Sequence, residues 1–287
     1  MNSPLLWQQD NSSSEATLSP ALSPQGRGGE WILAGCRLSS RLLVGTAGYP
    51  NLSILEDALA ASGTGVVTVG IRRVNLREKD EPGLLRLVRE RGYRLLPNTA
   101  GCYTAAEAIL TAQLARESLE TDWIKLEVIS DSYSLYPANE ELLKAARELV
   151  RLGFTVLPYC ADDPIVCKKL VDAGCPAVMP LAAPIGSGQG IRNRNNLLLI
   201  RKTVSVPLIV DAGVGTASDA AIAMEIGCDG ILINTAIAKA KDPVRMAAAM
   251  KRGVEAGRIA FESGRIPIKQ FATPSTPERG KIESRKS

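Results

Sequence analysis

A lysine and a glutamate stand two residues apart inside an apolar run, at Lys125 and Glu127 of residues 122–129. The run has the composition of a β-strand. Side chains alternate between the two faces of a strand, so Lys125 and Glu127 share a face with Trp123. The opposite face is wholly apolar and is expected to pack under helices. Because an unpaired ion in a core is costly, this amine and this carboxylate must point into a polar site.

The chemistry open to Lys125 depends on its pKa. An unperturbed lysine, with a pKa near ~10.4, holds only about one amine in ~2,500 unprotonated at pH 7. Burial in an apolar barrel lowers that pKa and makes the amine nucleophilic toward a ketone or aldehyde, which would make Lys125 a Schiff-base lysine. An ionised Glu127 acts the other way because it stabilises the ammonium. A structural Lys–Glu ion pair is therefore an equally good interpretation of the spacing.

Glycine-containing turns follow two later strands and predict an anion site. Gly213 begins Gly-Val-Gly-Thr before a helix, and Asn234-Thr235 follows the next strand. Free backbone N–H groups and the helix dipole favour an anion there, and these two loops commonly hold phosphate in barrels. Each turn taken alone is equally consistent with a plain tight connection. A third glycine-rich loop, residues 186–190, is either a ligand contact through Gly186 or a flexible loop.

Asp211 ends the strand before the first of these turns. A carboxylic acid at that place can relay protons to a bound substrate. Its alternative role is to cap the following turn. Asp163 is followed by Pro164, a pairing that favours capping of a helix with proline in its first turn.

Composition excludes several classes of chemistry. The 287-residue chain has no histidine, which rules out Ser-His-Asp and Cys-His catalysis and most catalytic zinc sites. Its six cysteines form no Cys-x-x-Cys pair, which indicates reduced, mostly buried thiols. The net charge is +4, but from Ile268 onward five basic residues stand against two acidic ones. The body of the protein is thus nearly neutral, and no run is long enough to span a membrane.

Short apolar runs alternate with amphipathic or alanine-rich segments from residue 41 onward. This rhythm predicts a single-domain α/β protein with a (β/α)8 TIM barrel, and a doubly wound sheet is the structural alternative. In a barrel, the polar loops after the strands meet on one face. The expected strands are 42–46, 66–71, 94–97, 123–129, 154–159, 177–180, 208–211 and 230–234, and the expected helices are 52–61, 104–117, 140–152, 164–172, 194–202, 218–226 and 243–256.

The two ends of the chain differ from the body. Residues 1–30 are rich in Ser, Pro, Gln and Gly, and we expect a disordered extension. Residues 31–38 are expected to form a small hairpin that turns at Gly35 and plugs one end of the domain. The barrel domain should then occupy residues 31–266, and residues 267–287 should form a flexible basic tail.

A series of motifs, taken together, resembles the bacterial thiazole synthase family of thiamine biosynthesis. The resemblance covers roughly residues 31–266. The motifs are VGT at 44–46, VTV at 67–69, LPNTAGC at 96–102, WIKLEV at 123–128, VLPY at 156–159, VMPL at 178–181, APIGSG at 183–188, VDAG at 210–213 and NTAIA at 234–238.

This resemblance implies a specific reaction. The lysine of the Trp-Ile-Lys-Leu-Glu strand, Lys125, would form an imine with the ketone of 1-deoxy-D-xylulose 5-phosphate, with Glu127 and Asp211 as the acid and base. Sulfur would come from the thiocarboxylate of a sulfur-carrier protein, and condensation with dehydroglycine (2-iminoacetate) would close the thiazole. The residues implied to hold the sugar phosphate are Gly186, Ala212, Gly213, Asn234 and Thr235.

The resemblance also implies the surroundings of the reaction. It implies a cytoplasmic homotetramer that uses neither a metal nor an organic cofactor and acts with an enzyme that supplies dehydroglycine. It implies no nucleic-acid or membrane partner. Two other functions stay open: another Schiff-base barrel for sugar phosphates, such as an aldolase or a pyridoxal-phosphate synthase subunit, and a phosphate-sensing barrel whose basic tail binds nucleic acid.

Overall fold

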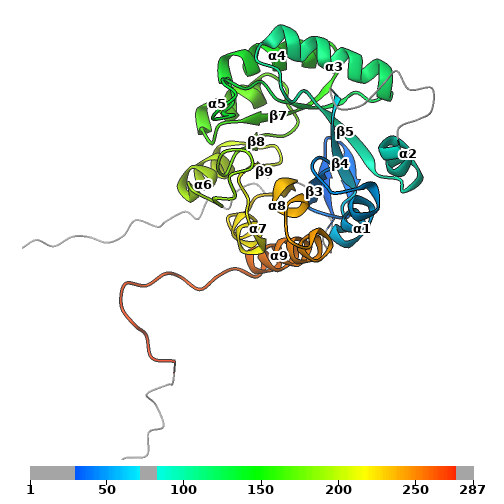
Figure 1. Ribbon diagram of the computed structural model, residues 1–287. Coiled ribbons are helices and arrows are strands. Elements are labelled where there is room, and N and C mark those ends of the chain that lie inside the picture. Colours follow the sequence, from blue (N-terminus) through cyan, green and yellow to red (C-terminus); the bar gives the residue numbers. More distant parts are fainter. Residues whose placement is uncertain (1–29, 72–82, 276–287) are drawn as a thin grey trace, which may run out of the picture.

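Eight parallel strands close into a barrel surrounded by helices (Figure 1). The computed structural model describes residues 30–71 and 83–275. The expected N-terminal extension up to residue 29 and the end of the basic tail from residue 276 lie outside the described residues. So do Arg72 and Arg73, which follow the second predicted strand and would either bind a carboxylate or face solvent. The barrel strands are β3 (Leu42–Gly45), β4 (Val66–Gly70), β5 (Arg94–Asn98), β6 (Trp123–Leu126), β7 (Thr155–Cys160), β8 (Met179–Pro180), β9 (Ile209–Asp211) and β10 (Gly230–Ile233).

The hydrogen-bonding order of the strands is that of a closed barrel. The strands pair in the order β8-β7-β6-β5-β4-β3-β10-β9, and each of these pairings is parallel. Two further parallel bridges, Val178 to Leu208 and Leu181 to Asp211, join the ends of that order. The predicted (β/α)8 barrel is confirmed, and the doubly wound sheet is excluded because its edges would stay open.

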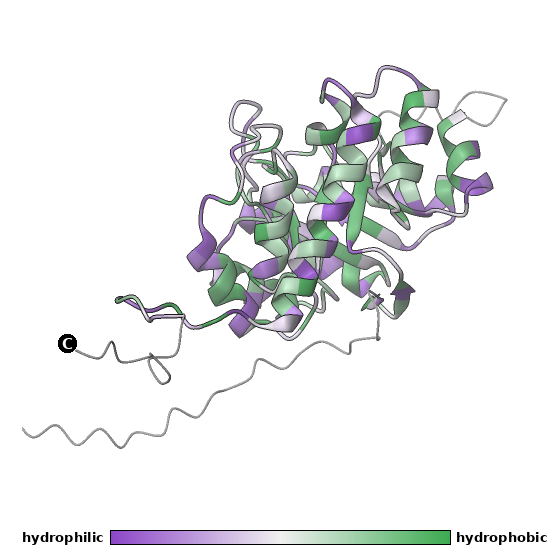
Figure 2. Cartoon of the chain, turned by 90° about the horizontal axis from the view of Figure 1, so that it is seen from below, coloured by the Kyte–Doolittle hydropathy of each residue, from purple (hydrophilic) through white to green (hydrophobic). Residues whose placement is uncertain are grey.

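Helices cover the outside of the barrel. Six of them agree with predicted segments to within two residues, and the seventh, α9, continues beyond the predicted residue 256, with Gly257 and Arg258 still buried. The prediction missed α2 and the single-turn α8. The helices are α1 (Leu52–Ser62), α2 (Gly83–Glu90), α3 (Ala105–Leu119), α4 (Asn139–Arg151), α5 (Pro164–Asp172), α6 (Arg194–Thr203), α7 (Ala217–Glu225), α8 (Thr235–Ala238) and α9 (Pro243–Ser263). Figure 2 shows hydrophobic and hydrophilic residues on the same helices, the pattern of helices that bury one side.

Local capping explains where several helices begin. The carboxylate of Asp163 accepts hydrogen bonds from the backbone N–H groups of Ile165 and Val166, with Pro164 in the first turn, as the sequence predicts. Asn51 and Asp242 cap α1 and α9 in the same way. None of the helices in the described ranges is long and apolar enough to cross a membrane.

The N-terminal hairpin closes one end of the barrel. Strands β1 (Trp31–Leu33) and β2 (Cys36–Leu38) pair antiparallel about Ala34 and Gly35, both with positive φ, as a two-residue hairpin turn requires. Trp31, Leu33 and Leu38 join the inward-facing residues at the amino ends of the barrel strands in one apolar cluster. The predicted plug is confirmed. It leaves the carboxyl ends of the strands as the open end of the barrel.

Strand β6 is shorter than predicted. It ends at Leu126 rather than residue 129, and Ile129 makes only an isolated antiparallel bridge with Pro137. The alternation of faces is nevertheless as predicted. Ile124 and Leu126 lie in the layer between strands and helices, whereas Trp123 lies inside the barrel. Lys125 and Glu127 therefore point toward the axis.

Candidate active site

A cavity of about 500 Å³ opens at the carboxyl ends of the strands. Its size suits a small phosphorylated metabolite. Every residue that the sequence marked as catalytic or phosphate-holding lines this one cavity: Lys125, Glu127, Asp211, Gly186, Ala212, Gly213, Asn234 and Thr235. The fold thus brings together groups from strands β6, β9 and β10 and from the loop after β8.

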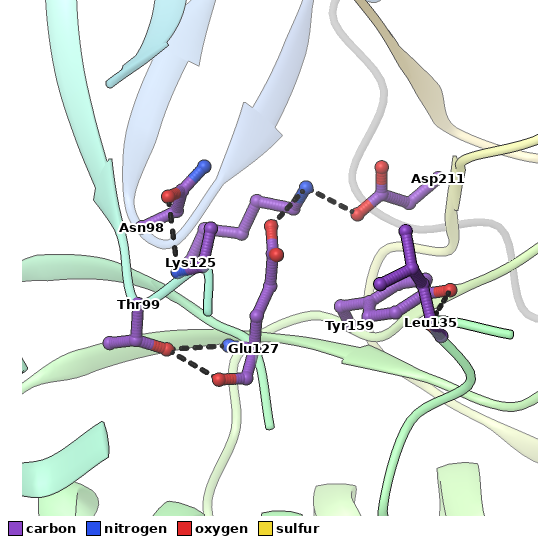
Figure 3. Close-up of polar contacts among 8 residues, drawn as sticks. Asn98, Thr99, Lys125, Glu127, Leu135, Tyr159 and Asp211 are labelled. Atoms are coloured by element: carbon purple, nitrogen blue, oxygen red, sulfur yellow. Dashed lines mark hydrogen bonds and ion pairs between the residues drawn. The ribbon is translucent and has the colours of Figure 1, made fainter. Parts of the chain in front are cut away.

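Lys125 lies between two carboxylates at the base of the cavity (Figure 3). Its ammonium Nζ is 2.8 Å from Oδ2 of Asp211 and 3.0 Å from Oε1 of Glu127. All three side chains are nearly excluded from solvent. Asp211 forms this ion pair across the barrel axis, and it also accepts a hydrogen bond from the backbone of Ala212 in the following turn, as the capping alternative predicted.

The electrostatics of Lys125 differ from the sequence-based expectation. Burial by itself disfavours the ammonium, but the charges and hydrogen bonds of Asp211 and Glu127 outweigh it and raise the pKa of Lys125 above its ordinary value. The expectation of a lowered pKa was wrong, because Asp211 supplies a second carboxylate that the strand pattern around Lys125 does not reveal. The two carboxylates therefore favour the ammonium form of Lys125.

The carboxyl group of Asp211 is shifted as well. Burial raises the pKa of Asp211 above its ordinary value, Lys125 opposes that rise, and Glu127 adds to it. A carboxylate that is held ionised chiefly by one neighbouring ammonium is well suited to take the proton of that ammonium. The pair can therefore exchange a proton when a ligand changes its surroundings.

The backbone of Glu127 is held by the side chain of Thr99. The Thr99 hydroxyl donates to the carbonyl of Glu127 at 2.7 Å, and the backbone N–H of Glu127 donates to the same hydroxyl at 2.8 Å (Figure 3). Thr99 is fully buried, and its own N–H donates to the carbonyl of Lys125 at 3.2 Å. Where β6 ends, a side chain rather than a neighbouring strand thus forms the hydrogen bonds of the backbone. The sequence marks Thr99 only as one polar residue in a loop and gives no sign of this contact.

Tyr159 forms the wall beside the lysine. Its ring centre lies 5.9 Å from Nζ of Lys125, and its hydroxyl donates to the carbonyl of Leu135 at 3.3 Å. Burial, then the negative charges of Asp211 and Glu127, raise the pKa of Tyr159 far above its ordinary value. The phenol therefore stays neutral and cannot serve as a base.

The turn after β9 has an unusual backbone that only small residues tolerate. Ala212 and Gly213 both have positive φ, 64° and 78°. A Cβ on Gly213 would come within 2.4 Å of the backbone N of Ala183, so this loop and the loop after β8 touch directly. Gly186 also has positive φ, and a Cβ on it would lie 3.9 Å from Cγ2 of Thr235, so the loop after β8 also lies close to the start of α8. The three loops form one glycine-lined rim.

Only part of the predicted anion site has free donors. The carboxylate of Asp219 accepts from the backbone N–H groups of Gly215 and Thr216, each at 3.0 Å, as a capping residue of α7. Asp219 is not among the residues that the sequence motifs marked. The first N–H groups of α8, at Thr235 and Ala236, have no intrahelical carbonyl to bind. Asp219 therefore occupies two backbone donors of the turn before α7.

Asn234 leads into α8 under tight constraints. A Cβ on Gly45 would lie 2.4 Å from Cβ of Asn234, so only glycine at position 45 leaves room for this side chain. The Oδ1 atom of Asn234 is buried and has no hydrogen-bond partner among the described residues. An unpaired buried acceptor beside a cavity is matched by a ligand that brings a donor.

The described residues contain no group of three or more His, Cys, Asp or Glu side chains that could hold a metal ion. All six cysteines are free thiols, and all but Cys36 are buried.

The fold and the site together define a (β/α)8-barrel enzyme whose cavity, at the carboxyl ends of the strands, holds a buried lysine between two carboxylates. The chain belongs to the family described as thiazole biosynthesis protein ThiG, whose sequence model matches residues 32–277. This is the family that the motifs indicated, and it places the enzyme in thiamine biosynthesis.

Curated relatives and a solved structure agree with this assignment. The chain is 62% identical over 244 residues to the thiazole synthase of Sorangium cellulosum, covering 85% of this chain and 94% of that protein. It is 59% identical over 251 residues to the thiazole synthase of Geobacter sulfurreducens, covering 88% and 96%. A chain in the crystal structure of the Amycolatopsis orientalis BexX/CysO complex aligns with a TM-score of 0.75 and 30% identity, over 84% of this chain and 98% of that one.

Proposed function

We propose that this thiazole synthase condenses 1-deoxy-D-xylulose 5-phosphate, dehydroglycine and carrier-bound sulfur into the thiazole phosphate of thiamine, through an imine on Lys125. The observation that carries the proposal is the contact of Lys125 with both Asp211 and Glu127 at the base of the cavity. A lone buried ammonium would be inert, whereas one flanked by carboxylates can pass on its proton and attack a carbonyl.

Imine formation needs a proton acceptor. When the ketone of the sugar enters, the ammonium of Lys125 transfers a proton to Asp211, whose raised pKa favours the acid form. The free amine adds to the ketone carbon, and the resulting carbinolamine loses water, with its hydroxyl protonated by the same acid. The products are one protonated imine and one water, and Asp211 is again a carboxylate. Glu127, 3.0 Å from the same nitrogen, can then remove a proton from the neighbouring sugar carbon and so move the carbonyl along the chain.

The other reactants follow from the family. Sulfur comes from the C-terminal thiocarboxylate of a small sulfur-carrier protein, and a separate enzyme supplies dehydroglycine. The Amycolatopsis orientalis neighbour is in a complex with CysO, which supports a protein partner for this chain too. We place the reaction in the cytoplasm and expect a homotetramer, both on the family resemblance.

Borohydride trapping tests the proposal. The protein is incubated with 1-deoxy-D-xylulose 5-phosphate and borohydride, and the adduct is mapped by peptide mass spectrometry. We expect one reduced adduct on Lys125, unchanged in the matched variant of an exposed lysine on α6, Lys202→Ala, and absent from Lys125→Ala. An adduct elsewhere, or none in the wild-type protein, rules out the imine mechanism. Reconstitution with carrier thiocarboxylate and dehydroglycine then shows whether thiazole phosphate is the product.

A further inference from the structure

The charges that line the cavity are unbalanced without Lys239. Among the described residues that line it, four side chains are ionisable: Lys125, Glu127, Asp211 and Lys239. Lys125 already forms ion pairs with Glu127 and Asp211, so it offers little to a phosphate dianion. Lys239 is the only basic side chain among the described lining residues outside that buried group.

Lys239 lies beside Thr235 at the rim of the cavity. It is the C-cap of α8 and its backbone N–H donates to the carbonyl of Thr235 at 3.0 Å, so the two residues lie one turn apart. Both residues line the cavity, so the lysine belongs to the part of the rim that includes Thr235.

The side chain of Lys239 has no polar partner among the described residues. Within residues 30–71 and 83–275 it takes part in no ion pair or side-chain hydrogen bond, and the residue is exposed. The opposite side of the rim offers less to an anion, because Asp219 occupies the N–H groups of Gly215 and Thr216 with a carboxylate. A dianion in this cavity therefore needs a cation on the α8 side.

We propose that Lys239 binds the phosphate of the sugar phosphate and sets the preference of the cavity for phosphorylated over neutral sugars. This inference rests on the proposed function, since it concerns the same substrate. It assigns to Lys239 a role in substrate binding and none in the proton transfers at Lys125.

The test measures binding and imine formation separately, on the full chain. Calorimetry gives the Kd for 1-deoxy-D-xylulose 5-phosphate and for its unphosphorylated sugar, and borohydride trapping gives the imine on Lys125. We expect Lys239→Met, which removes the charge and keeps the length, to weaken binding of the phosphorylated sugar by about 10- to 100-fold. Binding of the neutral sugar and the trapping rate at saturation should stay unchanged, and Lys239→Arg should recover most of the affinity.

Lys241 provides the matched control, because it is exposed two residues further on and does not line the cavity. Lys241→Met should leave the Kd for both sugars unchanged. Equal shifts in the two methionine variants, an unchanged Kd in Lys239→Met, or an equal loss for both sugars would overturn the role of Lys239. If the wild-type protein binds the phosphorylated sugar in a Lys239-dependent way but traps no imine, the imine mechanism fails and this inference stands. No binding of the phosphorylated sugar at all would overturn both.

Discussion

At the scale of single residues, the site is organised by one amine and two acids. Lys125 contacts Asp211 at 2.8 Å and Glu127 at 3.0 Å, and this contact raises the pKa of the amine. In the proposed mechanism, the carboxylates that hold the resting lysine as an ammonium also supply the proton acceptor that activates it. A tighter ion pair stabilises the folded protein but makes Lys125 a weaker nucleophile, so stability and reactivity are opposed at this site.

Removal of the lysine charge should change stability in a pH-dependent way. In Lys125→Met two buried carboxylates lose their cation, and we expect a loss of about 3–5 kcal/mol in the free energy of unfolding at pH 8. The pKa of Asp211 is already raised by burial, and loss of the opposing ammonium raises it further. A raised carboxyl pKa means that the folded state binds more protons than the unfolded chain. Stability therefore falls as pH rises from about 4 through the folded-state pKa, and it recovers on acidification.

Urea unfolding of Lys125→Met and the wild-type protein at pH 5, 6, 7 and 8 measures this effect. The difference between them should narrow toward pH 5. The exposed pair of Arg151 with Glu148 supplies the control, because Arg151→Met removes a cation whose loss solvent compensates. A constant difference across the pH range would show that the carboxylates do not take up the proton.

The hydroxyl of Thr99 should matter for catalysis although it lies behind the cavity. Thr99→Val keeps the shape and leaves the N–H and carbonyl of Glu127 without their partner. We expect a fall in kcat of roughly tenfold to a hundredfold, because the acid–base group shifts from its place, and a displaced pH–rate profile. Thr99→Ser should restore both. If valine and serine behave alike, the contact serves folding alone.

At the scale of elements, short strands and close helix packing set the geometry. Strand β9 has three residues and β8 two, so the chain passes from the floor of the barrel to the cavity in only a few residues. Helix α9 packs on α7 and α1 and so holds the loops after β9 and β10. A Cβ on Gly253 would lie 2.4 Å from the carbonyl O of Ala217, and one on Gly257 would lie 2.3 Å from that of Ala221. These glycines allow the two helix backbones to touch.

Gly257→Ala should therefore destabilise the protein. Alanine usually stabilises a helix interior relative to glycine by about 1 kcal/mol. Here the clash with a backbone carbonyl should exceed that gain and cost about 1–3 kcal/mol, which lowers Tm by several degrees. Calorimetry measures the change, with the exposed neighbour variant Ala256→Ser as control. An unchanged or higher Tm in Gly257→Ala would mean that α9 can move away from α7 at little cost.

At the scale of the whole molecule, the two ends of the barrel have different tasks. The hairpin β1–β2 and the apolar cluster around Trp31 fill the end at the amino termini of the strands. The ionisable and glycine-rich groups gather at the opposite end. This division is common to barrel enzymes, whose loops carry the chemistry while the floor holds the structure together.

Leu33→Ala tests this division. Leu33 is fully buried in the plug, and its truncation should cost about 2–5 kcal/mol of stability through lost contacts and a cavity. Well below the lowered Tm, the Kd for substrate and the rate of thiazole formation should match those of the wild-type protein. A changed Kd at low temperature would show that the plug also shapes the active-site end.

Much of the architecture follows from local patterns. The alternation of apolar runs with helical segments was enough to place all eight barrel strands, because each strand buried on both faces reads as a continuous apolar stretch. The period of two along β6 was enough to place Lys125 and Glu127 on the inner face. Helices α2 and α8 escaped prediction because a helix of eight residues and one of four carry too few periodic positions.

By itself the sequence determined the family, the barrel, the inward direction of Lys125 and the set of loops around the cavity, since all of these depend on motif order or on side-chain period. Only the tertiary structure decided the charge of Lys125, the anchoring of Glu127 by Thr99 and the position of Lys239 over the cavity. Electrostatic energy depends on distances between atoms. Asp211 reaches 2.8 Å from Lys125 because the sheet closes and brings β6 and β9 to face each other across its axis. No pattern local to either strand contains that distance.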